Sequence, residues 1–395
     1  MAERNVVLGV TGSIAAYKAV DLASRLTQAG VTVHTVMTDS ATKLVGPASF
    51  RAITGQPVST DMFELTNPFS IEHVSLAECA DLLLVAPATA NVLAKIAGGI
   101  ADDLLTCTVL ATRAPIVLAP AMHTAMWENP ATQANVATLR GRGIGFVGPV
   151  EGRLASGGIG IGRFAPVPQI CGEALGILGR NGDLAGARIV ISAAGTREPI
   201  DPVRFLGNRS SGKMGYALAE AARDRGADVR LVSGPTLIPR PAGVPVVDVE
   251  TAKEMHEAVK TACEGADVLI MAAAVADYAP AQAPARQKRK KADGPFRLEL
   301  TRTEDILDAV RDVPVRVGFA AETENPIDNA RAKLAAKRLD LIVANEIGGP
   351  NSPFGSDENQ ATLIDAAGTE CLPRTSKREL ADRILDRVTN MLPSK

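Results

Sequence analysis

The stretch VVLGVTGSIAAYKAVDLASRLTQAG at residues 6–30 decides how the chain can fold. Its first five residues form an apolar, β-rich run, and Thr11-Gly12-Ser13 supplies a turn. Apolar residues then recur at helical spacing over Ile14–Ala29, and Gly30 ends the pattern. A strand that turns directly into a helix begins a βαβ unit, and the next apolar run, Val31–Met37, provides its second strand.

The alternation of strands and helices continues through the first half of the chain. Apolar runs at Leu82–Ala86 and Ile116–Ala119 each stop at a Pro-Ala segment, and a helix is predicted over Val167–Leu178. The glycine-dense stretch Gly141–Gly162 has little regular pattern, so we interpret it as a mobile loop or flap. Alternating strands and helices are typical of parallel sheets, which bind ligands beyond the carboxyl ends of their strands.

The pattern restarts after residues 179–187, whose Gly, Asn and Asp content indicates a linker. Further strands are predicted at Ile189–Ser192, Val229–Val232, Val268–Ala272, Val315–Phe319 and Leu341–Ala344. We therefore expect an α/β protein with two doubly wound, Rossmann-like domains at residues 1–178 and 188–395.

The composition is that of an ordinary globular protein. Of 395 residues, 46% are hydrophobic and 22% charged, and the formal net charge of −2 argues against a nucleic-acid or anionic-membrane partner. With only nine Phe, three Tyr and one Trp, the core must consist of Ala, Val, Leu and Ile. No apolar stretch approaches the roughly 20 residues of a membrane span, and no signal peptide is visible. We expect a soluble, cytoplasmic protein.

The cysteines and histidines indicate which kinds of metal, disulfide and acid–base sites the chain can contain. The five cysteines include no Cys-x-x-Cys pair, which argues against a disulfide framework or a structural zinc site. Among the four histidines, His34 lies in a strand as a packed or surface residue, and His256 in a charged helix is predicted to face solvent. His73 lies in a loop or at a helix start, where a structural role is the first interpretation. His123, just past a strand end, is better placed for chemistry.

The turn at Gly12-Ser13 opens a helix, so its N–H groups and hydroxyl can bind an anion. Turns of this kind also open many α/β domains that hold no ligand there. No G-x-G-x-x-G pattern follows the first strand, so the dinucleotide fingerprint is not met.

Several motifs occur together in residues 4–175. They are Gly12-Ser-Ile-Ala-Ala-Tyr-Lys18, His73 with Ala80-Asp81, Ala86-Pro-Ala-Thr-Ala-Asn91, Ala101-Asp-Asp-Leu-Leu105 and Pro120-Ala-Met-His-Thr-Ala-Met-Trp127. Jointly they resemble the FMN-dependent cysteine decarboxylases, which implies a flavodoxin-like domain whose FMN oxidises a cysteinyl group so that CO2 leaves easily. The resemblance implies that His73 acts near the flavin as base or substrate orienter. The residues implied to hold FMN, with its phosphate near the helix start, are Gly12, Ser13, Thr38, Ser40 and Thr89.

Two residues depart from the pattern of that family. His123 replaces the usual Asn of the Pro-Ala-Met motif, which contacts the substrate carboxylate, and an imidazole can still donate a hydrogen bond to it. Ser156 stands in the glycine-rich flap where the family commonly has the cysteine that protonates the enethiolate. Three alternatives remain for this protonation. Ser156 can act with water, another group such as Cys171 can replace the cysteine, or the last step is slow.

The second half, about residues 186–392, has its own set of motifs. They are Gly195-Thr-Arg-Glu-Pro-Ile-Asp-Pro-Val-Arg204, Asn208-Arg-Ser-Ser-Gly-Lys-Met-Gly215, Ala272-Ala-Ala-Val-Ala-Asp277-Tyr and Gly318-Phe-Ala-Ala-Glu-Thr323. Together these motifs resemble phosphopantothenate–cysteine ligases. Ser-Ser-Gly-Lys213 is not a Walker motif, because Met214 follows the lysine. Together the two halves resemble the bifunctional enzymes of bacterial coenzyme A biosynthesis.

This resemblance implies a CTP-dependent ligase in which Asn208 contacts the acyl-cytidylate and Lys288 closes over it. Lys333 and Lys337 are four residues apart on a predicted helix, so both can reach one polyphosphate, which Mg²⁺ would accompany. Lys288 begins the basic run Lys288-Arg-Lys-Lys291, which alone would be interpreted as a solvated tail or nucleic-acid patch. The nucleotide-binding residues implied are Asp277, Lys288, Glu304, Asp305, Ile306, Leu307, Phe319, Lys333 and Lys337.

The favoured interpretation is therefore a bifunctional enzyme that joins L-cysteine to 4′-phosphopantothenate and decarboxylates the product to 4′-phosphopantetheine. Decarboxylation of a peptide's C-terminal cysteine and a flavoprotein that has lost activity are the alternatives. The resemblance also implies a homo-oligomer built from decarboxylase trimers and ligase dimers, with a dodecamer as the largest assembly considered.

Overall fold

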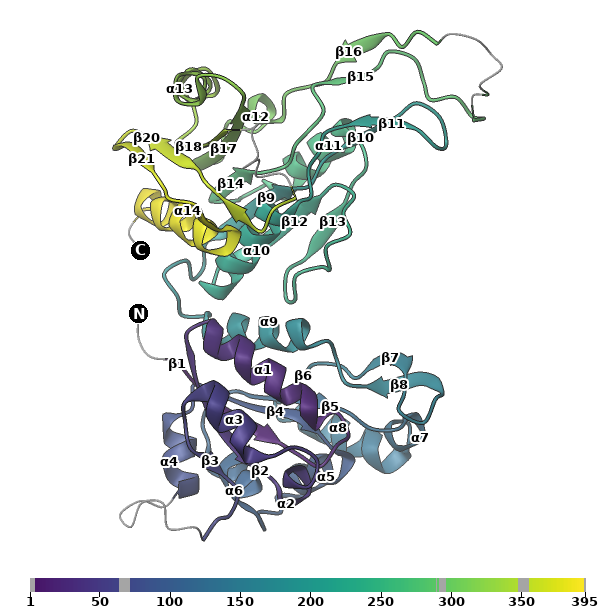
Figure 1. Ribbon diagram of the computed structural model, residues 1–395, viewed down its shortest axis with the longest axis vertical. Helices are drawn as coiled ribbons and strands as arrows, with labels where there is room; N and C mark the ends of the chain where they lie inside the picture. Colours follow the sequence, from purple (N-terminus) through teal and green to yellow (C-terminus); the bar gives the residue numbers. More distant parts are fainter. Residues whose placement is uncertain (1–3, 64–71, 289, 291–295, 347–354, 394–395) are drawn as a thin grey trace. The chain divides into compact units, whose positions relative to one another are not determined.

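The computed structural model describes residues 4–63, 72–288, 290, 296–346 and 355–393. The chain folds into two compact units, residues 1–178 and 179–395 (Figure 1). No helix in the described part of the chain is long and apolar enough to cross a membrane.

The first unit is built on one parallel sheet with the strand order β3-β2-β1-β4-β5-β6 among the described residues. Without the two-residue β3, this is the flavodoxin-like order, and the direction of winding reverses between β1 and β4. The strands are β1 (Arg4–Val10), β2 (Val31–Met37), β3 (Val58–Ser59), β4 (Leu82–Ala88), β5 (Ile116–Pro120) and β6 (Gly145–Phe146).

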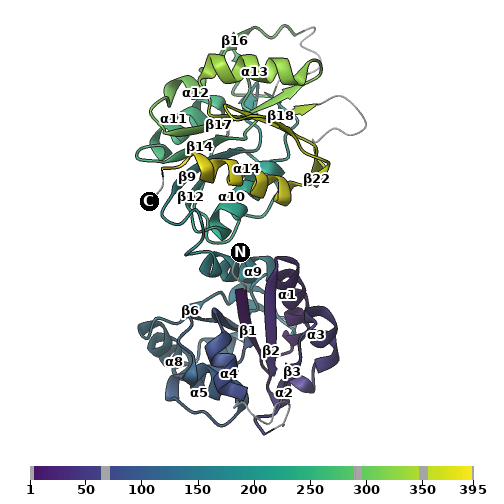
Figure 2. The ribbon, with the colours of Figure 1, turned by 90° about the vertical axis from the view of Figure 1, so that its left-hand side faces the viewer.

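Helices cover both faces of this sheet (Figure 2). The α1, α3 and α9 layer packs on one face, and the α4, α5, α6 and α8 layer packs on the other. The helices are α1 (Ala16–Gln28), α2 (Asp39–Thr42), α3 (Pro47–Thr54), α4 (Glu72–Cys79), α5 (Ala90–Gly98), α6 (Leu104–Ala111), α7 (Thr124–Trp127), α8 (Pro130–Gly141) and α9 (Val167–Leu178). Since all seven residues of β4 are buried, the near-continuous apolar runs of the sequence reflect strands covered on both sides.

The sequence analysis interpreted the glycine-dense stretch Gly141–Gly162 as a loop or flap with little regular structure. The structure instead shows paired strands in it. The stretch contains β6 and the antiparallel hairpin of β7 (Val150–Arg153) and β8 (Ile159–Arg163), which lies beside α7 (Figure 1). Gly162 has a φ of +140°, and a Cβ there would lie 2.4 Å from the carbonyl oxygen of Met122. Met122 N–H also donates to the carbonyl oxygen of Gly162 at 3.0 Å. The glycine therefore permits a close backbone contact that seats the hairpin on the main sheet's edge.

The second unit has a larger mixed sheet with the order β13-β12-β9-β14-β17-β18-β20-β21 among the described residues. Its parallel part follows the Rossmann order, and β20 and β21 extend it as antiparallel strands. The strands are β9 (Arg188–Ala193), β12 (Asp228–Ser233), β13 (Val246–Asp248), β14 (Val268–Met271), β17 (Val315–Glu322), β18 (Leu341–Glu346), β20 (Thr362–Asp365) and β21 (Gly368–Cys371).

Helices and short hairpins complete the second unit. α10 and α14 pack on one face of the sheet, and α11, α12 and α13 pack on the other. The helices are α10 (Lys213–Asp224), α11 (Ala252–Ala262), α12 (Ile306–Ala309), α13 (Pro326–Lys337) and α14 (Lys377–Met391). The short pairs are β10 (Arg197–Pro199) with β11 (Phe205–Gly207), β15 (Tyr278–Pro280) with β16 (Leu300–Arg302), and β19 (Glu358–Asn359) with β22 (Thr375–Ser376).

Two sequence-based expectations differ from this fold. Leu184, in the segment expected to be a linker, is 1% exposed within the second unit's core, because an apolar side chain in a polar segment can still be buried. His256, expected to face solvent, is buried at the α11 face that packs on the sheet. Its Nδ1 lies 3.6 Å from Oε2 of Glu304. The charged neighbours of His256 in the sequence lie on other faces of the helix.

Candidate active sites

In the first unit, the loops that follow β1, β4 and β5 are joined by hydrogen bonds at the carboxyl edge of the sheet. Ser13 Oγ donates to the carbonyl oxygen of Ala121 at 3.2 Å. Thr11 Oγ1 donates to the carbonyl oxygen of Pro87 at 2.7 Å and accepts from Thr89 N–H at 3.1 Å. These contacts assemble three motifs, far apart in sequence, at the point where the sheet reverses its winding.

A narrow cradle lies between the turn after β1 and the start of α2. A Cβ on Gly12 would lie 2.4 Å from Cβ of Ser40, so the residue here must be glycine for the two segments to approach. Thr38 Oγ1 is buried and has no hydrogen-bond partner among the described residues. A buried hydroxyl without a partner is rare unless a ligand or water completes it. The residues implied for FMN therefore fit a ligand with hydrogen-bonding groups.

Thr89 adds a further hydroxyl to the same edge. It is the N-cap of α5, and its Oγ1 accepts from Val92 N–H at 3.3 Å. Because the cap uses a lone pair of the oxygen, the hydroxyl proton is available to a ligand. The sequence-predicted group of Gly12, Ser13, Thr38, Ser40 and Thr89 thus comes from loops at one edge of the sheet.

His123 is the N-cap of α7, which is an unusual use of a histidine. Its Nδ1 accepts from Ala125 N–H at 3.3 Å, and the side chain is exposed. Since Nδ1 must carry a lone pair to accept this bond, the proton of the neutral ring is on Nε2. The cap therefore fixes the tautomer and leaves Nε2–H as a donor for a carboxylate, the function implied for the family's asparagine.

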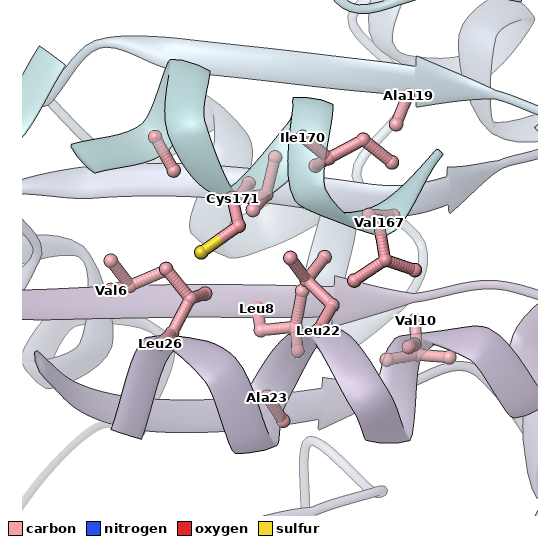
Figure 3. Packing of buried hydrophobic residues seen from close by; sticks show 14 of the residues in the cluster. Val6, Leu8, Val10, Leu22, Ala23, Leu26, Ala119, Val167, Ile170 and Cys171 are labelled. Carbon is pink, nitrogen blue, oxygen red and sulfur yellow. The ribbon is translucent and has the colours of Figure 1, made fainter. Parts of the chain in front are cut away.

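Three further residues of the first unit were considered for the reaction, namely His73, Ser156 and Cys171. His73 lies half-buried in the first turn of α4, and Ser156 lies exposed in the turn that joins β7 and β8. Within the described residues, no hydrogen bond joins either of them to Gly12, Ser13 or Thr89. Cys171 is 8% exposed and packs with Val6 and Leu26 in the core between α9 and α1 (Figure 3). The suggestion that Cys171 could replace the flap cysteine is wrong, because its thiol is enclosed by apolar side chains.

One quoted motif turns out to support a helix. Asp103 caps α6 through a capping box with Thr106, and Lys95 pairs with both Asp102 (2.7 Å) and Asp103 (3.1 Å). Burial alone would raise the pKa of Asp103, but the hydrogen bonds from Thr106 and Lys95 outweigh it and hold that pKa below its usual range. The residues Ala101–Leu105 are therefore explained by the helix that they begin.

The second unit contains a cavity of about 920 Å³ at the carboxyl ends of β14, β17 and β18. The winding of this sheet reverses between β9 and β14, beside the cavity. The segments lining it are 208–215, 271–278 and 302–307, joined by Phe319, Ala321, Lys333, Asn345, Asn359 and Lys377.

Asn208 is tied to the loop after β14. Its Nδ2 donates to the carbonyl oxygens of Ala274 and Val275 at 3.3 and 3.1 Å. Ala194, at a φ of 64°, accepts from Ala274 N–H at 2.8 Å, so the loops after β9 and β14 are held together. Asn208 and the exposed Asp277 therefore lie on one wall of the cavity, as expected for two residues of one site.

Most of the residues implied for nucleotide binding line this cavity, namely Asp277, Glu304, Asp305, Ile306, Leu307, Phe319 and Lys333. Lys333 Nζ donates to the carbonyl oxygen of Phe319 at 2.8 Å. Lys337 does not line it. It pairs with Asp305 at 2.7 Å and Asp308 at 2.9 Å, and the hydrogen bonds to these two carboxylates raise its pKa. Helical spacing placed the two lysines on one face, but it could not show the acidic partners of α12.

Lys288 is exposed and is not among the residues that line the cavity. Arg289 and Lys291, from the same basic run, lie outside the described residues. The structure therefore brings Asn208 and Asp277 together with Lys333 but leaves Lys288 apart from them.

Sequence reasoning gave no function to several polar residues of the cavity. Lys213 lies within a quoted ligase motif but was discussed only as a rejected Walker lysine. Arg302, Thr303, Asn345, Asn359 and Lys377 belong to none of the quoted motifs. No group of three or more His, Cys, Asp or Glu that could hold a metal ion occurs in the described residues.

Comparisons with known proteins match both units. The family described as Flavoprotein matches residues 1–178, and the DNA/pantothenate metabolism flavoprotein C-terminal domain matches residues 184–392. The coenzyme A biosynthesis bifunctional protein CoaBC of Mycobacterium tuberculosis is 46% identical over 408 residues, covering 98% of this chain and 97% of that protein. The protein of the same name from Bacillus subtilis is 45% identical over 392 residues, covering 98% of this chain and 96% of that protein. A solved C-terminal domain of a CoaBC protein is 42% identical with a TM-score of 0.46, covering 53% of this chain and 97% of that chain.

Proposed function

Because the chain belongs to the family of coenzyme A biosynthesis bifunctional proteins, we propose that its two units catalyse consecutive reactions of that pathway. The second unit joins L-cysteine to 4′-phosphopantothenate, and the first decarboxylates the product to 4′-phosphopantetheine. The observation that carries the proposal is that each unit has its own polar site at the reversal point of its own sheet.

In the second unit, the substrate carboxylate attacks the α-phosphate of CTP and releases pyrophosphate. The cysteine amine then attacks the acyl carbon of the acyl-cytidylate, and CMP leaves. Lys333 stabilises the negative charge, since it lines the cavity with its ammonium group next to the carbonyl of Phe319. Asn208 and Asp277 bind the acyl-nucleotide from one wall of the cavity, and Lys288 contacts the same intermediate.

Mg²⁺ is proposed to enter with the CTP phosphates. Phosphate oxygens and water molecules are the ligands that Mg²⁺ commonly has beside a nucleotide. Its role would be to neutralise charge on the pyrophosphate as it leaves.

In the first unit, FMN would be held by Gly12, Ser13, Thr38, Ser40 and Thr89, in the cradle that contains the unpartnered Thr38 hydroxyl. When bound, FMN supplies the two-electron oxidation that makes loss of CO2 from the cysteinyl group easy.

The chain's own side chains then bind and orient the substrate and move its protons. His123 Nε2–H donates to the substrate carboxylate, and His73 acts as base or orienter. Ser156, with water, returns the last proton. The first-unit sites are proposed to be completed in a homo-oligomer, with trimers of this unit and dimers of the second. Sedimentation of the purified full chain tests this assembly.

Reconstitution with separate readouts tests the proposed function. The full chain receives 4′-phosphopantothenate, cysteine, CTP and Mg²⁺, and pyrophosphate and CO2 are measured independently. We expect both products from the wild type, CO2 alone to disappear in His73→Asn, and both to disappear in Lys333→Ala. With phosphopantothenoylcysteine supplied directly, Lys333→Ala should release CO2 again. A yellow protein that forms neither product would contradict the proposal and favour a flavoprotein without this activity.

A further inference from the structure

We propose that His256, on α11, is a positioning residue that holds the carboxylate of Glu304 away from the phosphates of a nucleotide in the second unit's cavity. The inference rests on the proposed ligase function, because it needs a nucleoside triphosphate in that cavity. Glu304 lines the cavity, whereas His256 is not among the residues that line it. His256 therefore acts on nucleotide binding only through Glu304.

The described wall of this cavity contains three acidic residues, which work against the binding of a polyanion. They are Asp277, Glu304 and Asp305. Carboxylates that face the phosphates of a nucleotide repel them, most strongly where little water separates the charges. Asp305 has a cationic partner, since it pairs with Lys337 at 2.7 Å. Glu304 is the next residue toward the N-terminus, and its side chain is 82% exposed.

His256 provides a buried hydrogen-bond donor beside Glu304. The residue is 8% exposed, and its Nδ1 has no hydrogen-bond partner among the described residues. Nδ1 lies 3.6 Å from Oε2 of Glu304, about 0.4 Å beyond the upper limit of about 3.2 Å for an N–H···O hydrogen bond. Because an ionised carboxylate can only accept, Nδ1 carries the proton, and a neutral imidazole suffices as donor. A small rotation of the exposed glutamate completes the bond that the buried nitrogen lacks.

The chain on either side of Glu304 is fixed, so the side chain is the part that can move. Thr303 N–H donates to the carbonyl oxygen of Asp277 at 3.0 Å. Oδ1 of Asp305 accepts from Leu307 N–H at 3.0 Å and caps α12. Rotation of the Glu304 side chain can therefore change the charge at the cavity wall without moving the backbone of the wall.

His256 is held in place by the helix that carries it. A capping box begins α11 at Thr251, and Met255 and Val259 of the helix are fully buried in the core. α11 also packs against α12, which follows Glu304 in the chain (Figure 2). The imidazole therefore stays in position, and the exposed glutamate moves toward it.

Glu257 is the rival partner of the same nitrogen. Its Oε1 lies 3.7 Å from Nδ1 of His256, and its side chain is 65% exposed. Glu257 is not among the residues that line the cavity, so a bond to it would leave the charge of the wall unchanged. A nucleotide in the cavity repels Glu304 more strongly than Glu257, and its binding therefore favours the bond between His256 and Glu304.

The test measures the dissociation constants of CTP and of cytidine for the full chain by calorimetry. Cytidine keeps the base and the ribose but has no phosphate for a carboxylate to repel. We expect His256→Leu to weaken CTP binding at least fivefold and cytidine binding less than twofold. His256→Asn, whose amide can donate from nearly the position of Nδ1, should bind CTP within twofold of wild type. His256→Gln, whose amide takes the place of Nε2, should resemble His256→Leu and replaces it in the comparison if that variant does not fold.

Removal of each carboxylate identifies the partner of His256. In a Glu304→Ala background, His256→Leu should weaken CTP binding less than twofold, because no carboxylate is left to hold. In a Glu257→Ala background, the fivefold effect should persist. Equal losses for CTP and cytidine, or a fivefold loss that persists in Glu304→Ala, would overturn the inference. If the wild type binds CTP but forms no pyrophosphate with 4′-phosphopantothenate, the ligase assignment fails, and the same binding comparison still decides the role of His256.

Discussion

The capping histidine of α7 gives the sharpest prediction for the decarboxylase site. His123 has two tasks in the structure: Nδ1 accepts from Ala125 N–H at 3.3 Å, and Nε2–H is left to donate. His123→Ala removes both, His123→Asn keeps an acceptor and a donor, and His123→Asp keeps the acceptor but places a negative charge where the donor was.

The magnitudes follow from these contacts. A hydrogen bond to a charged group contributes about 1.5–3 kcal/mol, so loss of the donor should raise KM for phosphopantothenoylcysteine roughly 10- to 150-fold in His123→Ala. Loss of the cap costs about 1 kcal/mol of local stability, which affects a helix of only four residues. His123→Asn should stay within a few-fold of wild type, and His123→Asp should be weaker than His123→Ala because like charges repel.

The assay is CO2 release from purified phosphopantothenoylcysteine, with flavin absorbance to confirm that FMN is retained. A KM for His123→Ala within twofold of wild type, or equal activities of the Asp and Asn variants, would refute the assigned role.

Three further predictions concern other parts of the first unit. Gly162→Ala should lower CO2 release at least tenfold without changing pyrophosphate formation, because its Cβ would lie 2.4 Å from the carbonyl oxygen of Met122; Gly158→Ala, which meets nothing within 4 Å, is the control. Asp103→Ala should lower the free energy of unfolding by about 1 kcal/mol at neutral pH, as measured by urea denaturation. Since the folded-state pKa of Asp103 is held low, this stability is present above the ordinary carboxyl pKa, and the difference should shrink as the pH falls below about 4. Ser156→Cys should speed only the final protonation step in stopped-flow flavin spectra; an unchanged rate would show that Ser156 is not at the position of the proton donor.

Some strands and helices could be predicted closely because their signal is local. The strand Val31–Met37 and the helix Val167–Leu178 have the same bounds in the sequence-based prediction and in the structure, since apolar residues recur in each at the spacing of its element. The hairpin in Gly141–Gly162 could not be predicted in this way. This hairpin forms because β7 pairs with β8 and because Gly162 contacts Met122. Neither interaction produces a periodic pattern in the sequence.

The residues of the candidate sites differ in the same way, because some follow from the local sequence pattern and others depend on tertiary contacts. The segment with Thr89 follows a predicted strand, and the carboxyl ends of parallel strands meet at one edge, so its position could be predicted from the pattern. Asp277 was implied by the family resemblance alone. Lys377 could not be predicted, because only the pairing of β19 with β22 brings the start of α14 to the cavity. Lys337 lies on the expected face of α13, and its ammonium group pairs with Asp305 and Asp308, so its contact with the nucleotide stays a prediction.

The two departures from the family pattern in the first unit lie on elements that touch each other. His123 caps α7, and the hairpin that carries Ser156 contacts the preceding residue through the bond from Met122 N–H to Gly162. Asparagine and histidine meet the same two local requirements, an N-cap acceptor and an outward donor, so the change at residue 123 can leave substrate binding intact. Serine and cysteine do not share an equivalent property, since a hydroxyl is a far weaker acid than a thiol. We therefore expect substrate binding to tolerate the change at residue 123 better than proton return tolerates the change at residue 156.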